Sequence, residues 1–529
     1  MRMFSKSWKL PWLSPPPWRS SKSLDLEEEH GMLESQQRER VLSPNKDDIS
    51  VQRAWVARNV PKAIISLMLF FVPSFFRSHG STGEQSRNGD ASTSALDGLR
   101  GYAALAVMNY HLLYAYQPFV FYGYGLSENS AMQCARPEDM HHHNNWFHQL
   151  PIFRLIYVGT WPISVFFVLS GFVLSYKPLV QSRDASSGFT KAVKSMTSCF
   201  FRRPVRLYGP PIVASFITML AIQLGAYEHG RNIAYNPKWV PVINEQHQER
   251  LGSFGAQLLH WLDQSWRMLY VFWWGDLHNR YDVHLWTIPV EFRCSLAIFL
   301  ILPVYMILRS TIRVFLMAIL IVYVYALDRW DVALFFSGLL IADTAIASRK
   351  DAMSLNINKP DRNWPVVAMK VLLLIVSLWL MSAPDFCVME TPGFRLLGWL
   401  IPPSDPAPNR FLPNLGGILL VSLLTHTEQN NAAISWLLNS SIPQYLGRIS
   451  YSLYIVHGPL IHSVGYAVFP FFWTVSGTDE VWRYVIGFIS GYLVLLAVVL
   501  YVSDIFWRAV DVTFVRLAKA WFSRMVETT

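Results

Sequence analysis

The sequence predicts an all-α membrane protein, a polytopic bundle of about ten transmembrane helices. Of its 529 residues, 52% are hydrophobic and only 15% are charged, whereas a soluble protein carries about a quarter charged residues. The apolar residues also gather in runs of about 20 residues, which is the length needed to cross a hydrocarbon core. The predicted spans are 97–117, 153–176, 204–226, 285–308, 312–328, 330–348, 364–383, 411–427, 447–472 and 482–508.

Polar regions flank the bundle, which we expect to occupy residues 90–510. Residues 1–59 are rich in Ser, Pro, Glu and Arg, a composition typical of a disordered cytosolic tail. Residues 60–89 begin with an apolar run, 60–76, which has a proline near each end. We expect an interfacial or re-entrant helix there, followed by a linker, and an eleventh span is the alternative. Residues 511–529 are predicted to form a cytosolic C-terminal tail.

Basic residues determine the predicted orientation. The segment between the second and third spans has six Lys or Arg residues and one acid, Asp184, whereas the segment before the second span has Arg136 against three acids. Because Lys and Arg are enriched on the cytosolic side, the former segment is cytosolic and the latter external or lumenal. With ten spans, both termini are cytosolic. The net charge of +9 then reflects a membrane surface rather than a nucleic-acid partner.

Cysteine and histidine spacings give no sign of a metal centre. Four cysteines are too few for a disulfide scaffold and match no familiar zinc spacing. Cys134 and Cys387 both fall on the predicted external side and could pair, but free thiols are the favoured expectation. His141–His143 and His148 lie in an external loop rich in Asn, and we expect them to be solvated. The sequence therefore predicts no metal.

Two ionisable residues, Arg100 and His111, share the first predicted span. In a helix, an eleven-residue step makes about three turns, so both side chains lie on one face, roughly 16 Å apart along the axis. An ionisable group inside a membrane costs about 3 kcal/mol and is a functional-site hypothesis by default. The alternatives are a neutral, hydrogen-bonded His111 and a cytosolic anchor at Arg100 that pairs with Asp97.

Five short motifs follow one another along the chain. They are Leu96–Gly101 with His111 (Arg-x10-His), Phe166–Phe172, Arg203–Pro210 (Arg-x-x-Arg), Leu285–Phe292 (Trp-Thr-Ile-Pro-Val-Glu) and Tyr445–Gly458 (Gly-Arg-Ile-Ser-Tyr). Together they resemble the motifs of the acyltransferase 3 family of integral membrane O-acyltransferases, in its fungal branch. The resemblance covers residues from about 90 to 508. Gly209 is a minor departure, since it interrupts the usual Arg-Leu-Tyr-Pro order.

The resemblance implies that an acyl group, often acetyl, moves from cytosolic acyl-CoA to an acceptor hydroxyl. It makes His111 the catalytic base, a role that suits an imidazole because its pKa lies near neutrality. Arg100 is expected to contact CoA phosphate or to organise the site. Glu291 is expected to orient His111 or to hold the acceptor, and an ion pair with Arg293 or another span is the alternative.

The anionic donor needs a cationic site at the cytosolic mouth of the third span. The residues expected to bind it are Arg202, Arg203 and Arg206, although basic residues at that position are also the topological default. The residues expected to line the acceptor cavity are Trp286, Tyr454 and His457, and anchoring at the membrane interface is their alternative. Ser170 and Gly171 are expected to permit close helix packing.

A transporter that couples substrate or protons through buried Arg, Glu and His is the alternative function. It predicts repeated halves, which the sequence does not display. An inactive scaffold is a third hypothesis. The acceptor, the acyl chain length, the organelle and the oligomeric state are not determined by the sequence.

Overall fold

The computed structural model describes residues 69–76, 94–140, 142–184, 187–243, 245–273, 277–354, 364–403, 405, 407–427 and 436–526, without side chains for 350–354. The predicted tail 1–59, most of the predicted interfacial segment 60–89 and His141 lie outside these ranges. Within them the chain is helical, and the sole β-pairing is an isolated bridge between Asn279 and Asp282. The all-α prediction is confirmed.

Sixteen α-helices account for most of the described residues 73–529. They are α4 (Ser94–Tyr116), α5 (Glu128–Cys134), α6 (Thr160–Ser182), α7 (Gly188–Gln223), α8 (Glu228–Ala234), α9 (Phe254–Leu269), α10 (Thr287–Ile307), α11 (Ser310–Ala326), α12 (Trp330–Ser354), α13 (Trp364–Met381), α14 (Arg395–Gly398), α15 (Pro408–Thr425), α17 (Ser441–Leu460), α18 (Tyr466–Ser476), α19 (Val481–Phe506) and α20 (Val512–Met525).

Short helical turns connect several of these helices. The 3-10 turns are η1 (Ser74–Phe76), η3 (Pro118–Val120), η4 (Pro137–Asp139), η5 (Phe147–Gln149), η6 (Phe153–Ile156) and η7 (Val283–Trp286). Two π-helical turns, η8 (Ile461–Gly465) and η9 (Trp507–Asp511), continue α17 into α18 and α19 into α20. The predicted spans 447–472 and 482–508 are therefore parts of longer, interrupted helices.

Seven helices of the described chain are long and apolar enough to cross a membrane. Each of the ten predicted spans coincides largely with a helix, but three of them fall short of this standard. At 310–326, α11 has only 17 residues. The other two, α4 and α15, carry polar residues such as Arg100, His111 and Arg410. The count of ten therefore stays a prediction. In α4, the candidate site residues Arg100 and His111 are themselves polar, and they lower the mean hydropathy of the helix.

Two helix starts differ from the prediction. The second span begins at Thr160 rather than near 153, because 153–156 forms the separate turn η6. The third begins at Gly188 rather than 204, so that Pro204, Pro210 and Pro211 lie inside α7. The positive segment between these spans is thus largely helical.

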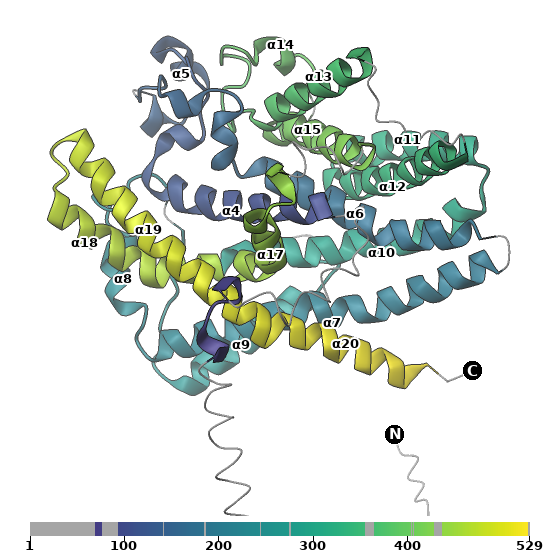
Figure 1. Ribbon diagram of the computed structural model, residues 1–529. Helices are drawn as coiled ribbons and strands as arrows, with labels where there is room; N and C mark the ends of the chain where they lie inside the picture. The colour runs from purple at the N-terminus through teal and green to yellow at the C-terminus, as the bar shows by residue number, and fades with distance from the viewer. Residues whose placement is uncertain are drawn as a thin grey trace, which may run out of the picture. The chain divides into compact units, whose positions relative to one another are not determined.

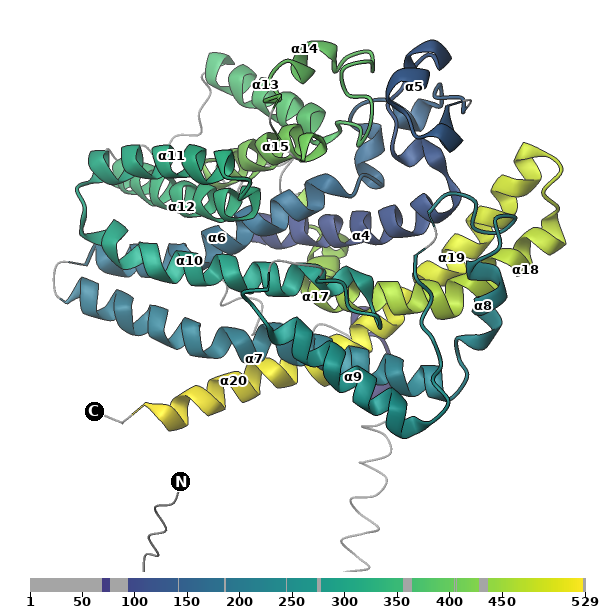
Figure 2. The ribbon, with the colours of Figure 1, turned by 180° about the vertical axis from the view of Figure 1, so that it is seen from behind.

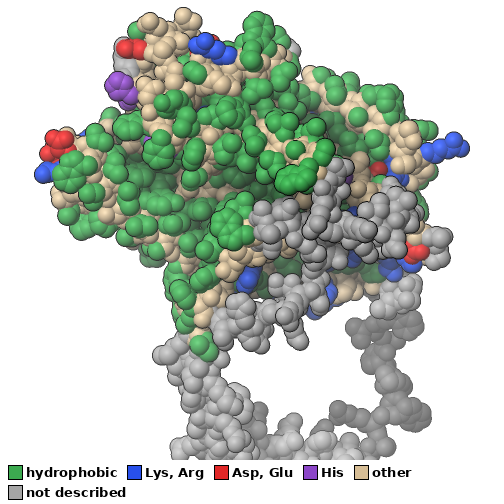
Figure 3. Space-filling model, turned by 45° about the horizontal axis from the view of Figure 1, so that its top comes forward, with side chains coloured by type: hydrophobic (Ala, Val, Ile, Leu, Met, Phe, Trp, Pro, Cys, Tyr) green, Lys and Arg blue, Asp and Glu red, His purple; other side chains and the backbone are tan. Residues whose placement is uncertain are grey.

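Close packing brings α4 against α17 and α6 against α12, and both views show α6 among α4, α10 and α12 (Figures 1 and 2). Glycines make these contacts. A Cβ on Gly171 would lie 2.0 Å from the Phe335 carbonyl oxygen, and one on Gly447 would lie 2.2 Å from that of Asp97. The predicted packing role of Gly171 is confirmed. Hydrophobic side chains cover most of the face seen in Figure 3, as a lipid-facing surface requires.

We expect Gly171→Ala to destabilise the protein by about 2 kcal/mol or more, because overpacking a dense interface forces backbone shifts. The clash is with backbone, which has no rotamer to change. Gly255→Ala is the matched control, since a Cβ there meets no atom within 4 Å. Thermal unfolding of the detergent-purified variants checks this, and equal midpoints for the two would contradict it.

A disulfide joins Cys134, at the end of α5, to Cys387, in the segment that follows α13. The expectation of free thiols at these positions is wrong. The cause is tertiary: the backbone carbonyl of Phe121 accepts hydrogen bonds from the amides of Asp385 (3.0 Å) and Phe386 (3.2 Å). These bonds bring two loops together that are 253 residues apart at the cysteines.

Candidate active site

The long helix α4 carries both Arg100 and His111, as the spacing predicts. At the first position, Arg100 pairs with Asp97 at 3.2 Å and donates a 3.2 Å hydrogen bond to Ser450 Oγ of α17. Three turns on, His111 Nδ1 lies 2.9 Å from the Tyr114 hydroxyl, and its side chain is 20% exposed. One helix therefore connects a cationic end to an imidazole in the interior.

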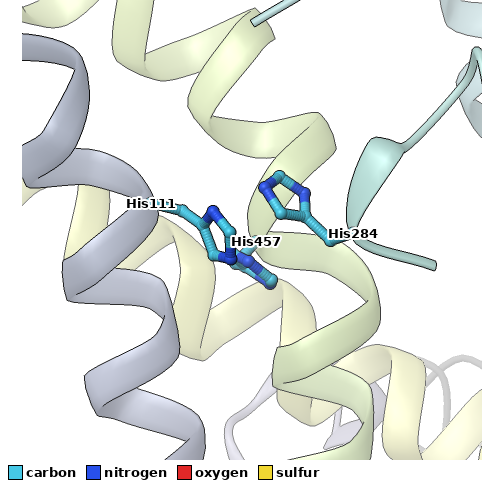
Figure 4. A group of neighbouring side chains, drawn as sticks. All are labelled: His111, His284 and His457. Carbon is cyan, nitrogen blue, oxygen red and sulfur yellow. The ribbon is translucent and has the colours of Figure 1, made fainter. Parts of the chain in front are cut away.

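Three imidazoles converge at His111, as Figure 4 shows: His111 from α4, His457 from α17 and His284 from η7. The ring centroids of His111 and His284 are 3.9 Å apart, those of His284 and His457 are 4.7 Å apart, and those of His111 and His457 are 5.4 Å apart. The structure thus places the predicted His457 beside His111. It adds His284, which sequence reasoning missed although it stands just before the Trp-Thr-Ile-Pro-Val-Glu motif.

Two carboxylates hold His284. Asp282 begins the turn η7, where its Oδ1 accepts from the His284 backbone amide at 3.0 Å and lies 2.7 Å from His284 Nδ1. Glu245 approaches from the opposite side of the ring, with Oε1 at 2.9 Å from Nε2. Both ring nitrogens of His284 are therefore engaged.

Glu245 also contacts two further histidines. Its Oε1 lies 3.6 Å from His111 Nδ1, and its Oε2 lies 2.8 Å from Nε2 of His462, which is part of the π-turn η8. The side chain of Glu245 is 11% exposed. Burial raises the pKa of this carboxyl, but the charge of His284 and the hydrogen bonds of His111, His284 and His462 outweigh it and hold the pKa well below the usual value. Glu245 and His462 have no sequence signal, since neither belongs to a motif.

His457 presents an unused nitrogen. Its Nδ1 donates to the backbone carbonyl of Tyr454 at 2.7 Å, which leaves a lone pair on Nε2. Nε2 is buried and has no hydrogen-bond partner among the described residues. A buried acceptor of this kind suits a hydroxyl-bearing ligand, because an unpaired polar atom is costly to bury.

Nitrogen atoms of the three central histidines lie within 4.8 Å of one another. A metal ion would nevertheless need a lone pair from His284, whose two nitrogens face Asp282 and Glu245. Two remaining imidazoles are fewer than the three protein ligands of a catalytic zinc site. Cys134 and Cys387 do not supply metal ligands either, because they form a disulfide and neither sulfur is a thiolate. The expectation of no metal therefore stays a prediction.

A cavity of about 200 Å³ reaches residues that contact the cluster, although none of the three histidines lines it. Arg100, Arg203 and Arg206 line it together with apolar side chains of α6. Its wall also includes Tyr454 and Thr287, whose hydroxyls are 2.6 Å apart. The Tyr454 hydroxyl donates to the backbone carbonyl of His284. The cavity therefore extends from a basic group of side chains to the residues that support the histidines.

Glu291 lies in the cavity wall, where it pairs with Arg203 of α7 at 2.8 Å and accepts from Ser170 Oγ at 2.9 Å. Arg203 Nε also donates to Ser295 Oγ at 2.6 Å. An ion pair with another span was the alternative for Glu291, and this is what the structure places there. Ser170 thus meets a polar group rather than only a packing partner.

Four predicted site residues do not line this cavity. His111 and His457 belong to the histidine cluster, whereas Arg202 and Trp286 have other contacts. The guanidinium of Arg202 donates to the Ser198 carbonyl of its own helix. The Trp286 ring contacts the guanidinium of Arg410 at 5.7 Å. Neither lines the cavity, whereas the neighbouring predicted residues Arg203 and Tyr454 do.

The known proteins to which this chain is similar include three that are named as an acyltransferase or an O-acetyltransferase. The chain is 31% identical to the O-acetyltransferase PaAT-1 of Phomopsis amygdali over 83% of its own length and 86% of that protein. It is 27% identical to the acyltransferase R4 of a Phoma species and 24% identical to the acyltransferase clz18 of Cochliobolus lunatus, in each case over 80% of this chain and 94% of the relative. No solved structure is significantly similar.

A family model described as an acyltransferase domain matches residues 93–508. This range begins at α4 and ends within η9, so it contains the histidine cluster and every residue named above as lining the cavity. The chain belongs to the acyltransferase 3 family, and it is an acyltransferase enzyme.

Proposed function

We propose that this acyltransferase moves an acyl group from cytosolic acyl-CoA to a hydroxyl of a small-molecule, lipid or glycan acceptor, with His111 as the general base. One observation carries the proposal: the arginine-lined cavity ends at the residues that support the histidine cluster. Acetyl is the favoured acyl group, because one relative is named an O-acetyltransferase.

The donor would bind along the cavity. The phosphates of CoA require cations, and a guanidinium binds phosphate oxygens bidentately. Arg206 is exposed and lines the cavity, and it forms no ion pair within the described part of the chain. Arg203 is already paired with Glu291. Arg100 is also paired, with Asp97, but that pair is more exposed to solvent than the pair of Arg203 and Glu291. We therefore assign the phosphate contact to Arg206 with Arg100, and assign Arg203 and Glu291 to shaping the cavity wall.

Transfer would proceed directly. His111 takes the acceptor's hydroxyl proton while the hydroxyl oxygen attacks the thioester carbonyl. The tetrahedral intermediate collapses, the carbon–sulfur bond breaks, and the CoA thiolate takes the proton back from His111. His457 Nε2, a buried lone pair, would accept a hydrogen bond from the acceptor. No covalent acyl-enzyme is required.

The proposed orientation has both termini in the cytosol and the disulfide outside. Disulfides persist in oxidising compartments and are rare in the cytosol, so the pair Cys134–Cys387 supports an external or lumenal position for that side. The donor would then reach Arg206 from the cytosol, and the acceptor would enter from the membrane or the far side.

Arg206→Ala is expected to raise the KM for acyl-CoA about tenfold with little change in kcat, because uniform binding is lost. Lys194→Ala, an exposed change on the same helix, is the matched control. Membranes incubated with radiolabelled acetyl-CoA and an extract of a deletion strain supply both constants. Equal KM values in the two variants would remove Arg206 from the donor site.

The same assay tests the proposed function as a whole. Wild-type membranes should label a hydroxylated compound of the extract, and the label should depend on acyl-CoA. Substrate flux that is independent of CoA, with no labelled product, would instead contradict the proposal.

A further inference from the structure

Five side chains form one continuous hydrogen-bonded network, called the buried chain below, that reaches from the histidine cluster to the segment between α8 and α9. The chain begins at Asp282 and passes through His284 (2.7 Å), Glu245 (2.9 Å) and His462 (2.8 Å) to His247 (3.3 Å). His247 Nε2 then lies 2.9 Å from the backbone carbonyl oxygen of Tyr227. All five members are largely buried.

A proton count shows that the far half of this chain holds an extra proton. The Tyr227 carbonyl can only accept, so His247 Nε2 carries a hydrogen. If His247 is neutral, its Nδ1 is a lone pair that accepts from His462 Nδ1. His462 Nε2 then faces the carboxylate of Glu245, which also only accepts. Three hydrogen bonds need three protons, and two neutral rings supply two.

The third proton belongs to His462. The Glu245 carboxylate lies within 2.9 Å of a nitrogen of both His284 and His462 and accepts from both, so we assign the proton to the His462 ring. Burial lowers the pKa of His247 to about 4, which keeps that ring neutral. The low pKa of Glu245 agrees with an ionised carboxylate between its partners.

The same count applies at His284. Its two nitrogens face Asp282 and Glu245, and a neutral ring has only one hydrogen to donate. His284 is therefore also an imidazolium. Two carboxylates then alternate with two imidazolium ions, so that the buried chain has no net charge and every bond along it has a donor and an acceptor.

Glu245 is the central member, and the backbone carries it to its place. The amides of Val242 and Ile243 donate 3.2 Å hydrogen bonds to the carbonyls of Ala115 and Tyr114 at the end of α4. These carbonyls lack partners within their own helix. The segment that supplies Glu245 is thus fixed to the helix that carries His111.

We propose that Glu245 is a positioning residue of the acyl-transfer site, which holds His284 and His462 as imidazolium ions and fixes His111 with its proton on Nδ1. With Nδ1–H facing Tyr114 and Glu245, Nε2 of His111 keeps the lone pair that takes the hydroxyl proton. This inference rests on the proposed function, and it adds a group that no motif contains.

Glu245→Gln tests the role because an amide preserves the geometry. Its carbonyl oxygen accepts from His284, and its NH₂ group donates to a neutral His462, so every hydrogen bond survives with one proton fewer. The amide carries no negative charge to stabilise the imidazolium that forms when His111 takes the hydroxyl proton. We therefore expect kcat to fall about 100-fold, with both KM values within about threefold of the wild type and an unchanged thermal midpoint. A wild-type kcat would overturn the positioning role.

Glu249→Gln is the matched control, since Glu249 is an exposed carboxylate four residues along the same segment. Its kcat should equal that of the wild type. A loss of kcat as large as that of Glu245→Gln would attribute the effect to the segment rather than to Glu245.

Nitrogen-15 NMR of histidine-labelled protein in lipid counts the protons without any activity. At pH 8, exposed histidines are neutral because their pKa is about 6.5, so imidazolium signals report buried rings. Two are expected in the wild type and one in Glu245→Gln and in His462→Gln. No such signal in the wild type would overturn the proton count, whereas absence of transfer with both signals present would contradict only the proposed function.

Discussion

His111→Ala should abolish acyl transfer, with a fall in kcat of at least about 1,000-fold, because a positioned general base contributes roughly 100- to 10,000-fold. The imidazole extends from α4 to the rings of both His284 and His457. The side chain of His111 is 20% exposed, so its truncation removes little apolar packing from the core. We therefore expect the variant to fold and to remain in the membrane.

Metabolite profiling measures this effect in the cell. A deletion strain complemented with wild-type protein should regain a product heavier by one acyl group, and a strain with His111→Ala should not. His143→Ala, a change at an exposed histidine between α5 and α6, is the control and should complement fully. Undiminished turnover by the purified His111→Ala protein would remove His111 from the catalytic role.

Gly458→Ala should lower kcat about 100-fold without removing any functional group. A Cβ at this position would lie 2.4 Å from His284 Nδ1 and 2.8 Å from Asp282 Oδ1. Both contacts are far too short, so the added methyl group must move the hydrogen-bonded pair. A displacement of about 1 Å in a reacting site can cost a factor of 100.

Gly465→Ala provides the comparison for Gly458→Ala. Gly465 is buried on the same continuous helix, but a Cβ there would meet only ordinary contacts, the nearest being Leu495 at 3.5 Å. Its kcat and thermal midpoint should stay close to those of the wild type. If the two variants have the same kcat, then the position of His284 and Asp282 does not matter for transfer.

The apolar runs predicted the helices well because each helix satisfies its own backbone hydrogen bonds, whatever surrounds it. The sequence alone also placed Arg100 and His111 on one helix, since this needs only the helical repeat. The sequence predicted the ends of the helices less accurately. The start of α7 at Gly188 lies before a run of basic residues, and hydropathy does not detect a helix that continues beyond the apolar run.

The sequence by itself determined the class of fold and the family motifs, and it singled out His111 as the proposed base. Only the tertiary structure decided the partners of these residues: Glu291 with Arg203, Cys134 with Cys387, and Glu245 with three histidines. Helical repeats and motifs are local patterns, whereas His462 meets Glu245 across 217 residues. A contact of that kind depends on how helices pack and where a connecting segment attaches, and neither leaves a periodic trace in the chain.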